Sequence, residues 1–309
     1  MRVAVIGASG RLGAALTAEF ASREYTVAAL HRADLDLTSR DSVEETLGEF
    51  GPDVIVNCSA YNAVDAAQTD MASAFALNAT GPAFLADVAH RTGAVLVHYS
   101  SDFVFDGTAC EPYTEDSPTN PLSVYGASKL AGEHEARKTP RHYVLRVESL
   151  FGGSGINGHR ATVDHIADRI LRGDQVRAAV DRAVSPTYVP DAVNATAELV
   201  ERELEYGVYH CVNSGHTTWY ELAQEIAGQL GAPEADIVAM HADDLPVVAP
   251  RPRFCALANR KLSSGGITMP IWRSAVARHI AEAHPTGRTA CSSPPQPCNS
   301  RGRRPGVAL

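Results

Sequence analysis

A serine, a tyrosine and a lysine stand in an order that suits proton transfer. Ser101 ends an apolar run, and Tyr125 and Lys129 follow it, four positions apart from each other. Side chains four positions apart on a helix project from one face, so the lysine ammonium would lie beside the phenol. Such a charge lowers the pKa of tyrosine from its ordinary value of about 10 by favouring the phenolate. We predict that Tyr125 and Lys129 transfer a proton and that the Ser101 hydroxyl polarises a carbonyl group.

A glycine-rich turn near the start of the chain predicts a dinucleotide site. The sequence VIGASGRLG spaces three glycines between an apolar run and a helical pattern. Glycines there let backbone amides approach a pyrophosphate, which the N-terminus of the next helix also attracts. The residues of this turn expected at the cofactor are Gly7, Ser9, Gly10, Arg11, Leu12 and Gly13. Each motif alone has a plainer interpretation, a helix-packing loop or an exposed Tyr/Lys pair, but their combination in this order favours a catalytic site.

The residues after the second apolar run bear on which cofactor is bound. His31 and Arg32 stand where an NAD site carries an acid for the ribose hydroxyls. Guanidinium groups from Arg32 and Arg11 suit a 2′-phosphate, because their fork matches phosphate oxygens. This favours NADPH, while a solvated surface role for Arg32 stays open. Asp36 and Leu37 could hold the adenine amino group beside an apolar wall; the alternative for Asp36 is an acid at a helix N-terminus.

Strand-like and helical patterns alternate along the chain. Six short apolar runs are expected to be strands, at 2–6, 26–30, 53–57, 94–100, 142–147 and 207–213. Helical patterns lie between them, near 11–22, 40–50, 70–91, 124–138, 160–172 and 191–206. The alternation predicts an α/β fold, a Rossmann-type doubly wound parallel sheet with a smaller C-terminal substrate-binding domain. Ligands of such sheets bind beyond the carboxyl ends of the strands, where the glycine turn and Ser101 both fall.

The length of 309 residues allows two domains that share a core. We expect a dinucleotide-binding domain over 1–146, to which a later strand near 207–213 returns. A mainly substrate-binding domain should follow over 147–284. The segment 285–309 is expected to be disordered, because it is rich in proline and arginine and lacks apolar periodicity.

Charge and cysteine usage limit the partners and the compartment. The net charge is −9, with no long basic run before the tail, which argues against a nucleic-acid partner. No apolar run is long enough to span a membrane, and no signal peptide is visible. The six cysteines are widely spaced, which favours a reduced, cytoplasmic protein over a disulfide framework or a zinc site.

Longer motifs extend over about nine tenths of the chain, among them DVIVNCSAYNAVDAAQ, HYSSDFVFDG, PLSVYGASKLAGE, SPTYVPD and RPRFCALANRKL. With the glycine turn, they resemble the extended short-chain dehydrogenases/reductases, and within them the dTDP-4-dehydrorhamnose reductases. The resemblance implies an NAD(P)H-dependent oxidoreductase that reduces the 4-keto group of a nucleoside-diphosphate 4-keto-6-deoxysugar. NADPH is the expected cofactor, with NADH left open, as is a homodimer.

The same resemblance implies roles for single residues. Tyr125 would donate the proton, Lys129 would lower its pKa and hold the nicotinamide ribose, and Ser101 would bind the developing oxyanion. Further cofactor contacts are expected from Cys58, Ser59 and Ala60. The substrate contacts expected are Ser101, Asp102, Phe103 and Arg251, the last as a clamp on the pyrophosphate, with an ordinary loop arginine as the alternative.

Departures from the family pattern bear on the reaction. Sugar dehydratases of the superfamily carry an Asp-Glu pair after the serine, whereas here Phe103 follows Asp102, which favours simple reduction. Rhamnose-forming members carry a tryptophan in an R-T-S-W pattern that reads RVES here, ending at Ser149, so the sugar and its epimer stay open. Ala14 and Ala15 stand where some members carry a metal-binding glutamate, so we expect no structural metal. An NAD-retaining epimerase and a non-catalytic regulatory subunit remain the alternatives.

Overall fold

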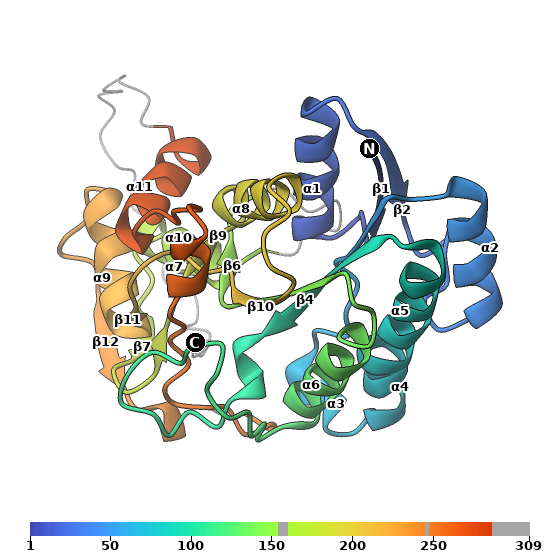
Figure 1. Cartoon of the computed structure of the whole chain (residues 1–309). Coiled ribbons are helices and arrows are strands. Elements are labelled where there is room, and N and C mark those ends of the chain that lie inside the picture. The colour runs from blue at the N-terminus through green and yellow to red at the C-terminus, as the bar shows by residue number, and fades with distance from the viewer. Residues whose placement is uncertain (154–159, 245–246, 286–309) are drawn as a thin grey trace.

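The computed structural model describes residues 1–153, 160–244 and 247–285, so the tail expected to be disordered lies almost wholly outside the described residues. At the centre of the molecule is a six-stranded sheet in the order β10-β5-β4-β3-β1-β2, with every neighbouring pair parallel. Its strands are β1 (Arg2–Ile6), β2 (Thr26–Leu30), β3 (Val54–Asn57), β4 (Val95–Ser101), β5 (His142–Val147) and β10 (Gly207–His210). Figure 1 shows helices on both sides of this sheet, which confirms the predicted Rossmann-type α/β fold.

Alternate residues of each strand enter two different cores. Val3 and Val5 of β1 pack with α1 (Arg11–Ser22) and α8 (Val189–Glu201) on one face. Ala4 and Ile6 face the other side and pack with α2 (Arg40–Phe50) and α5 (Gly81–Thr92). Burial on both faces explains why these strands are continuous apolar runs in the sequence.

The sheet reverses its direction of growth beside β1. The chain adds β2 on one side of β1, then crosses to add β3 on the other side. Such a reversal opens a crevice at the carboxyl ends of the two central strands, which is where doubly wound folds bind their ligands. The glycine turn follows β1 and therefore lies at this crevice.

The helix expected over 70–91 is three segments. They are α4 (Met71–Phe75), a π-helical turn (Ala76–Thr80) and α5, and the short α3 (Val64–Ala67) precedes them. The π-helical turn carries Asn78. Its Oδ1 accepts from the backbone nitrogen of Tyr61 (2.7 Å), and its Nδ2 donates to the carbonyl oxygen of Tyr61 (3.2 Å) and to Ser128 Oγ (2.9 Å). Ser128 lies on α6 (Val124–Ala136), so this turn ties the loop after β3 to that helix.

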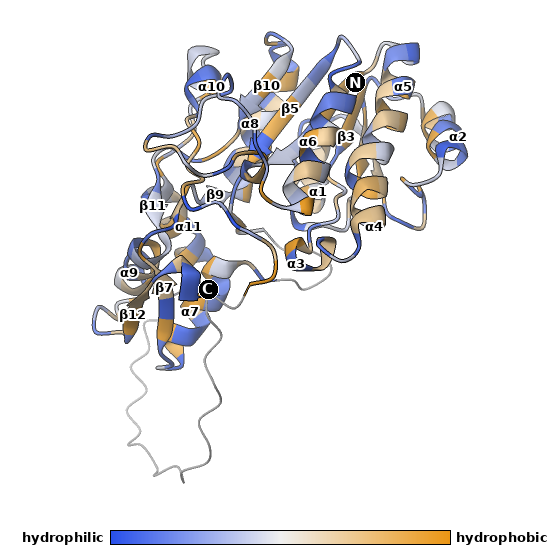
Figure 2. Cartoon of the chain, turned by 90° about the horizontal axis from the view of Figure 1, so that it is seen from below, coloured by the Kyte–Doolittle hydropathy of each residue, from blue (hydrophilic) through white to orange (hydrophobic). Residues whose placement is uncertain are grey.

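A second, smaller lobe lies beside the carboxyl ends of the sheet (Figure 2). Its core is formed by apolar residues such as Ile166, Leu222 and Trp272. Its helices are α7 (Thr162–Leu171), α9 (Trp219–Gln229) and α11 (Trp272–Ala283). Its short strand pairs are β6 (Leu150–Phe151) with β9 (Thr187–Tyr188), β7 (Val176–Ala179) with β12 (Ile237–Met240), and β8 (Ala183–Val184) with β11 (Thr217–Thr218). Two 3₁₀ turns (Asp102–Val104 and Ala242–Asp244) and α10 (Arg260–Ser264) complete the described elements.

The chain enters the second lobe after β5 and later returns to the sheet. Both α8 and β10 fall within 147–284, yet α8 packs beside α1 and β10 pairs with β5. A single boundary in the sequence therefore does not separate the two lobes, and the division into domains over 1–146 and 147–284 stays a prediction. In the part of the chain that the structure describes, no helix has the length and apolar character needed to cross a bilayer.

Candidate active site

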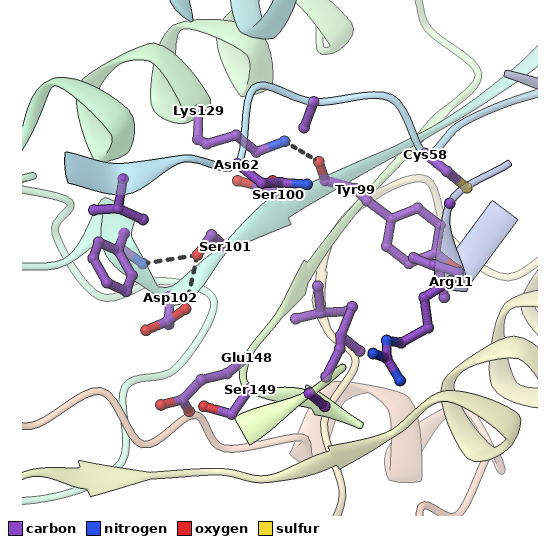
Figure 3. Close-up of a pocket in the computed structure, with 18 of the residues that line it drawn as sticks. Arg11, Cys58, Asn62, Tyr99, Ser100, Ser101, Asp102, Lys129, Glu148 and Ser149 are labelled. Atoms are coloured by element: carbon purple, nitrogen blue, oxygen red, sulfur yellow. Dashed lines mark hydrogen bonds between the residues drawn. The ribbon is translucent and has the colours of Figure 1, made fainter. Parts of the chain in front are cut away.

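The carboxyl ends of the central strands open onto a cavity of about 550 Å³ (Figure 3). Ser101, Tyr125 and Lys129 all contribute to its wall. Gly10 and Gly13 line it from the glycine turn. The structure thus brings the three predicted catalytic residues and the predicted phosphate loop to one site.

The glycine turn has a shape that only glycine allows. Gly7 has a φ of +78°, and a Cβ atom there would lie 2.9 Å from the backbone nitrogen of Ser59. A Cβ atom on Gly13 would lie 2.3 Å from the carbonyl oxygen of Gly7. Helix α1 therefore starts directly against the turn, and its first backbone amides are presented to the cavity, where they can bind phosphate oxygens.

A second cavity of about 530 Å³ lies across the glycine turn from the first, and Ser59 lines both. His31, Arg32 and Leu37 line this second cavity, at the end of β2. Asp36 also lines it, but its Oδ1 accepts hydrogen bonds from the backbone nitrogen and the hydroxyl of Thr38 (2.9 and 2.7 Å), which lower the pKa of Asp36. The two cavities therefore adjoin at Ser59, one on each side of the glycine turn.

The two arginines expected at a 2′-phosphate line different cavities. Arg11 was expected beside Arg32 at a 2′-phosphate, but it lines the first cavity and Arg32 lines the second. The guanidinium of Arg11 donates to the carbonyl oxygens of Gly152 (3.0 Å) and Gly153 (3.2 Å). The long side chain of Arg11 therefore reaches away from β2, toward the second lobe, where carbonyl acceptors are available.

Ser101 is the last residue of β4 and caps the 3₁₀ turn that follows it. Its Oγ donates to Asp102 Oδ1 (2.7 Å) and accepts from the backbone nitrogen of Phe103 (3.2 Å). Figure 3 marks both contacts with dashed lines. Because a carboxylate can only accept, the one hydroxyl hydrogen of Ser101 goes to Asp102 in this arrangement.

Tyr125 and Lys129 project from the first turns of α6, which Ser123 caps by accepting from the nitrogen of Gly126 (3.1 Å). The ring of Tyr125 packs edge-on against Phe103, with ring centroids 5.5 Å apart. Lys129 Nζ donates to the carbonyl oxygen of Tyr99 at 2.5 Å (Figure 3). Both side chains are buried.

Burial dominates the electrostatics of this pair. Burial, reinforced by the charge of Asp102, raises the pKa of Tyr125 above its ordinary value, and a hydrogen bond with Ser101 acts in the opposite direction. Burial lowers the pKa of Lys129 to about 8, which the charge of Glu133 opposes. In this structure the ammonium group is directed to the Tyr99 carbonyl oxygen and desolvation dominates the pKa of Tyr125, so the expected lowering of that pKa by Lys129 stays a prediction.

Most of the other residues predicted at the cofactor and the substrate also line the first cavity. These are Cys58, Ser59, Ala60, Asp102 and Phe103.

Arg251, expected to clamp the substrate pyrophosphate, does not line either cavity among the described residues. It forms a two-pronged ion pair with Asp65 (3.0 Å for each bond), which lowers the pKa of Asp65 to about 2. A loop arginine with a structural partner, the alternative considered for it, matches this contact.

Several cavity residues were not singled out from the sequence. Arg160, Thr162 and Trp219 come from the second lobe, and no local motif marks Arg160 or Thr162. Trp219 follows the capping box that opens α9, a signal for a helix start but not for a binding residue. Glu148 was noticed only as a departure from a family pattern, yet it is buried in the cavity wall.

Comparisons with known proteins point in one direction. A family model described as the RmlD substrate binding domain matches residues 1–284. The probable dTDP-4,6-dihydroxy-2-methyloxan-3-one 4-ketoreductase of Streptomyces antibioticus is 36% identical, over 93% of this chain and 99% of the relative. The dTDP-4-dehydrorhamnose reductase of Streptomyces griseus is 37% identical, over 88% of this chain and 90% of the relative.

Solved structures agree with these relatives. The dTDP-4-dehydrorhamnose reductase of Bacillus anthracis, solved in complex with NADP, superposes with a TM-score of 0.85. It is 30% identical, and the match covers 91% of this chain and 99% of that one. A UDP-glucose 4-epimerase of Thermus thermophilus, solved with NAD, has a TM-score of 0.75 at 22% identity, which shows a shared fold and no more.

Proposed function

The chain belongs to the family of the RmlD substrate binding domain, and we propose on this basis that it reduces the 4-keto group of a dTDP-linked 4-keto-6-deoxysugar with NADPH. It is an NAD(P)H-dependent oxidoreductase. The observation that carries the proposal is the meeting of Ser101, Tyr125 and Lys129 with the glycine turn around one cavity.

The residues of the cofactor site fit a dinucleotide. The space that a Cβ atom would fill at Gly7 and Gly13 is needed for the turn to close, and the turn presents the start of α1 to a pyrophosphate. His31 and Arg32 offer donors at the adenosine end, where the 2′-phosphate distinguishes NADPH from NADH. When bound, the cofactor supplies the hydride.

The chain's own residues then handle the proton and the developing charge. Tyr125 donates its phenol proton to the carbonyl oxygen as that oxygen becomes negative. Ser101 donates a hydrogen bond to the same oxygen, which stabilises the transition state. Lys129, which donates to the Tyr99 carbonyl oxygen, would hold the nicotinamide ribose, and its ammonium charge would favour the phenolate that remains.

The sugar occupies the part of the cavity that Asp102, Phe103 and Ser149 line. A serine at position 149 leaves room that a large aromatic side chain would fill, so the proposal extends to sugars with bulkier or more polar substituents than dehydrorhamnose. The dTDP group is taken from the names of the relatives.

Expectations about the compartment, the partners and the oligomeric state complete the proposal. The protein acts on a small-molecule substrate in the cytoplasm, without a nucleic-acid partner. The cysteines at 58, 110, 211 and 255 are free thiols, as a reducing compartment would keep them. A homodimer remains an expectation that sedimentation of the purified protein would decide.

The test is a panel of dTDP- and UDP-linked 4-keto-6-deoxysugars, each assayed for oxidation of NADPH and of NADH, with the products identified. Tyr125→Phe should lower kcat on the best substrate by on the order of 10²-fold or more, because the general acid is lost. Its affinity for NADPH should be unchanged, as judged by fluorescence titration. Unaltered turnover in Tyr125→Phe, or a tightly retained NAD with no oxidation of added NADPH, would contradict the proposal.

A further inference from the structure

Two buried acids meet beside the predicted oxyanion donor. Strands β4 and β5 are neighbours, and Ser101 is in register with Val147 at their carboxyl ends. The next residues along the two strands, Asp102 and Glu148, therefore come together. Both lie in the cavity wall and are only 4% and 3% exposed. Figure 3 shows both carboxyl groups on the same side of the cavity, away from Arg11.

The contacts of the two acids leave one oxygen without a partner. Oε2 of Glu148 accepts from the backbone nitrogen of Ser185 (2.6 Å), and Asp102 Oδ1 accepts from the Ser101 hydroxyl (2.7 Å). Oε1 of Glu148 is buried and has no hydrogen-bond partner among the described residues. One oxygen of each acid and Sγ of Cys255 lie within 4.8 Å of one another. A buried acceptor in such a place is satisfied by a hydrogen between the two acids, by a water molecule or by a cation.

The charges around the pair favour a proton. The groups that face it are the Cys255 thiol, the Arg182 guanidinium and the phenol of Tyr125. Burial raises the pKa of both acids and outweighs the attraction of Arg182, which lowers it. The charge of Asp102 raises the pKa of Glu148 further. The positive charge of Arg182 also disfavours a metal cation at the same place. Two carboxylates this close in a buried site bind one proton between them more readily than either would alone.

The proton decides what Ser101 can do. A serine hydroxyl carries one hydrogen. While Asp102 is ionised, that hydrogen is held by Asp102 Oδ1, and Ser101 offers the cavity only lone pairs. When Asp102 carries the shared proton on its other oxygen, toward Glu148, Oδ1 becomes the uncharged carbonyl oxygen of a carboxyl group. An uncharged oxygen is a weaker acceptor than a carboxylate, so the Ser101 hydrogen turns more readily toward a substrate oxygen.

We propose that Glu148 is a positioning residue that shares one proton with Asp102 and thereby frees the Ser101 hydroxyl to donate to the substrate carbonyl oxygen. The proposal rests on the reductase function proposed above, and it adds Glu148 to the residues on which turnover depends. Glu148 itself need not touch the substrate.

The first test uses the protein without cofactor or substrate. Infrared spectra at neutral pH should show the carbonyl stretch of a protonated carboxyl group, although ordinary acids, with pKa values of about 4, are ionised there. Glu148→Gln should remove this band, because a glutamine amide can donate to Asp102 and stabilise its ionised form. Glu111→Gln, which makes the same change at an exposed position, should keep the band. Absence of the band in the unaltered protein would overturn the proposal, whether or not the variants fold.

The second test is the pH dependence of kcat. In the unaltered enzyme, kcat should fall as the shared proton leaves at raised pH. Glu148→Gln should lower kcat at neutral pH by on the order of 10- to 100-fold, as expected for loss of an oxyanion donor, and move this fall to lower pH, with KM for NADPH unchanged.

A second substitution separates positioning from structure. Adding Asp102→Asn to Glu148→Gln should restore part of kcat, because the asparagine amide can donate to Ser101 Oγ at every pH. For the same reason, kcat of the double variant should lose this pH dependence. A pH profile of Glu148→Gln that superimposes on that of the unaltered enzyme, or no rescue in the double variant, would contradict the proposal. If no sugar of the panel is reduced, the proposed function fails, while the infrared test still decides whether the proton is shared.

Discussion

Arg32 is the residue on which the preference for NADPH depends most directly. It is exposed just beyond β2 and lines the second cavity with His31. We predict that Arg32→Ala raises KM for NADPH by roughly 10- to 100-fold, the value of one charge-assisted hydrogen bond of about 1.5–3 kcal/mol to the 2′-phosphate. KM for NADH should change little, because that cofactor has no phosphate there. Steady-state kinetics with both cofactors measure the difference.

An exposed arginine outside both cavities provides the matched control. Arg91→Ala removes the same charge from the surface, where Arg91 pairs loosely with Glu44 at 3.7 Å. Neither KM should change in this variant. Equal rises of both KM values in Arg32→Ala would mean that Arg32 supports the fold of the site and does not select the cofactor.

At the scale of single residues, sequence predicts the side-chain positions that the helical backbone fixes. It does not predict which distant partner a long, flexible side chain will contact. Tyr125 and Lys129 had to share a face, because the helical period leaves no alternative. Arg11 and Arg251 have flexible side chains, and they bond to Gly152 and Asp65, which lie 141 and 186 positions away in the chain. No local sequence pattern identifies such a distant partner. The predicted roles of both arginines at phosphate groups therefore depended on tertiary contacts that the sequence does not show.

At the scale of elements, the contact between α1 and the glycine turn supports a prediction about Gly13. A Cβ atom there would lie 2.3 Å from the Gly7 carbonyl oxygen, so Gly13→Ala must push the helix away from the turn. We expect the free energy of unfolding to fall by about 1–3 kcal/mol, as for other overpacked sites, and the affinity for NADPH to fall with it. Denaturant unfolding and fluorescence titration measure the two effects.

The chain offers a matched glycine for comparison. Gly48 lies within α2, is exposed, and has nothing within 4 Å of the position of a Cβ atom. Gly48→Ala should therefore stabilise the protein by up to about 1 kcal/mol, because alanine has the higher helix propensity, and leave NADPH binding unchanged. If both substitutions had the same effect on stability, close packing at the turn could not be the reason for Gly13.

The elements themselves were predictable to different extents. The sheet strands were found within a few residues, because burial on both faces makes them continuous apolar runs. The predicted helix over 70–91 missed the π-helical turn, which is held by contacts of Asn78 with Tyr61 and Ser128. Strands of two residues, such as β8 and β11, show no periodicity at all, because they exist only through pairing with a distant segment.

At the scale of the whole molecule, two buried histidines should influence stability at mildly acidic pH. His98 accepts from the Asn57 amide in the core, and His210 contacts the carbonyl oxygen of Ala258. Burial lowers the pKa of His210 to about 3 and lowers the pKa of His98 well below its ordinary value of 6.5. Both histidines therefore stay neutral in the folded protein while they take up protons in the unfolded chain.

The sign of the effect follows from linkage. Below the unfolded pKa of 6.5 the unfolded chain binds more protons, so the stability that neutral His210 contributes is complete above that pH. It is lost as the pH falls toward about 3, by about 1.4 kcal/mol for each pH unit. We predict that His210→Gln makes the dependence of the free energy of unfolding on pH shallower by this amount between pH 5 and about 6.5. Urea denaturation across this range measures the difference in slope between the variant and the unaltered protein.

A difference in slope is the proper quantity, because the raised pKa values of Asp102 and Glu148 act in the opposite direction at the same pH. These acids retain protons in the folded protein, so their contribution to the free energy of unfolding grows as the pH falls. His90→Gln, at an exposed position, should leave the slope as it is. An unchanged slope in His210→Gln would mean that the folded protein accommodates the charged imidazole.

The late return of α8 and β10 to the sheet bears on how such enzymes can be recombined. A hybrid made by joining two homologous genes at one point after β5 would combine the α1 and β5 of one parent with the α8 and β10 of the other. The mismatch would fall inside the core of the cofactor-binding half, in packing around Tyr143 and Tyr209, far from the sugar whose identity the engineer wished to change. Swapping specificity in this scaffold therefore calls for inserts bounded on both sides, with the returning helix and strand kept from the parent that supplies the rest of the sheet.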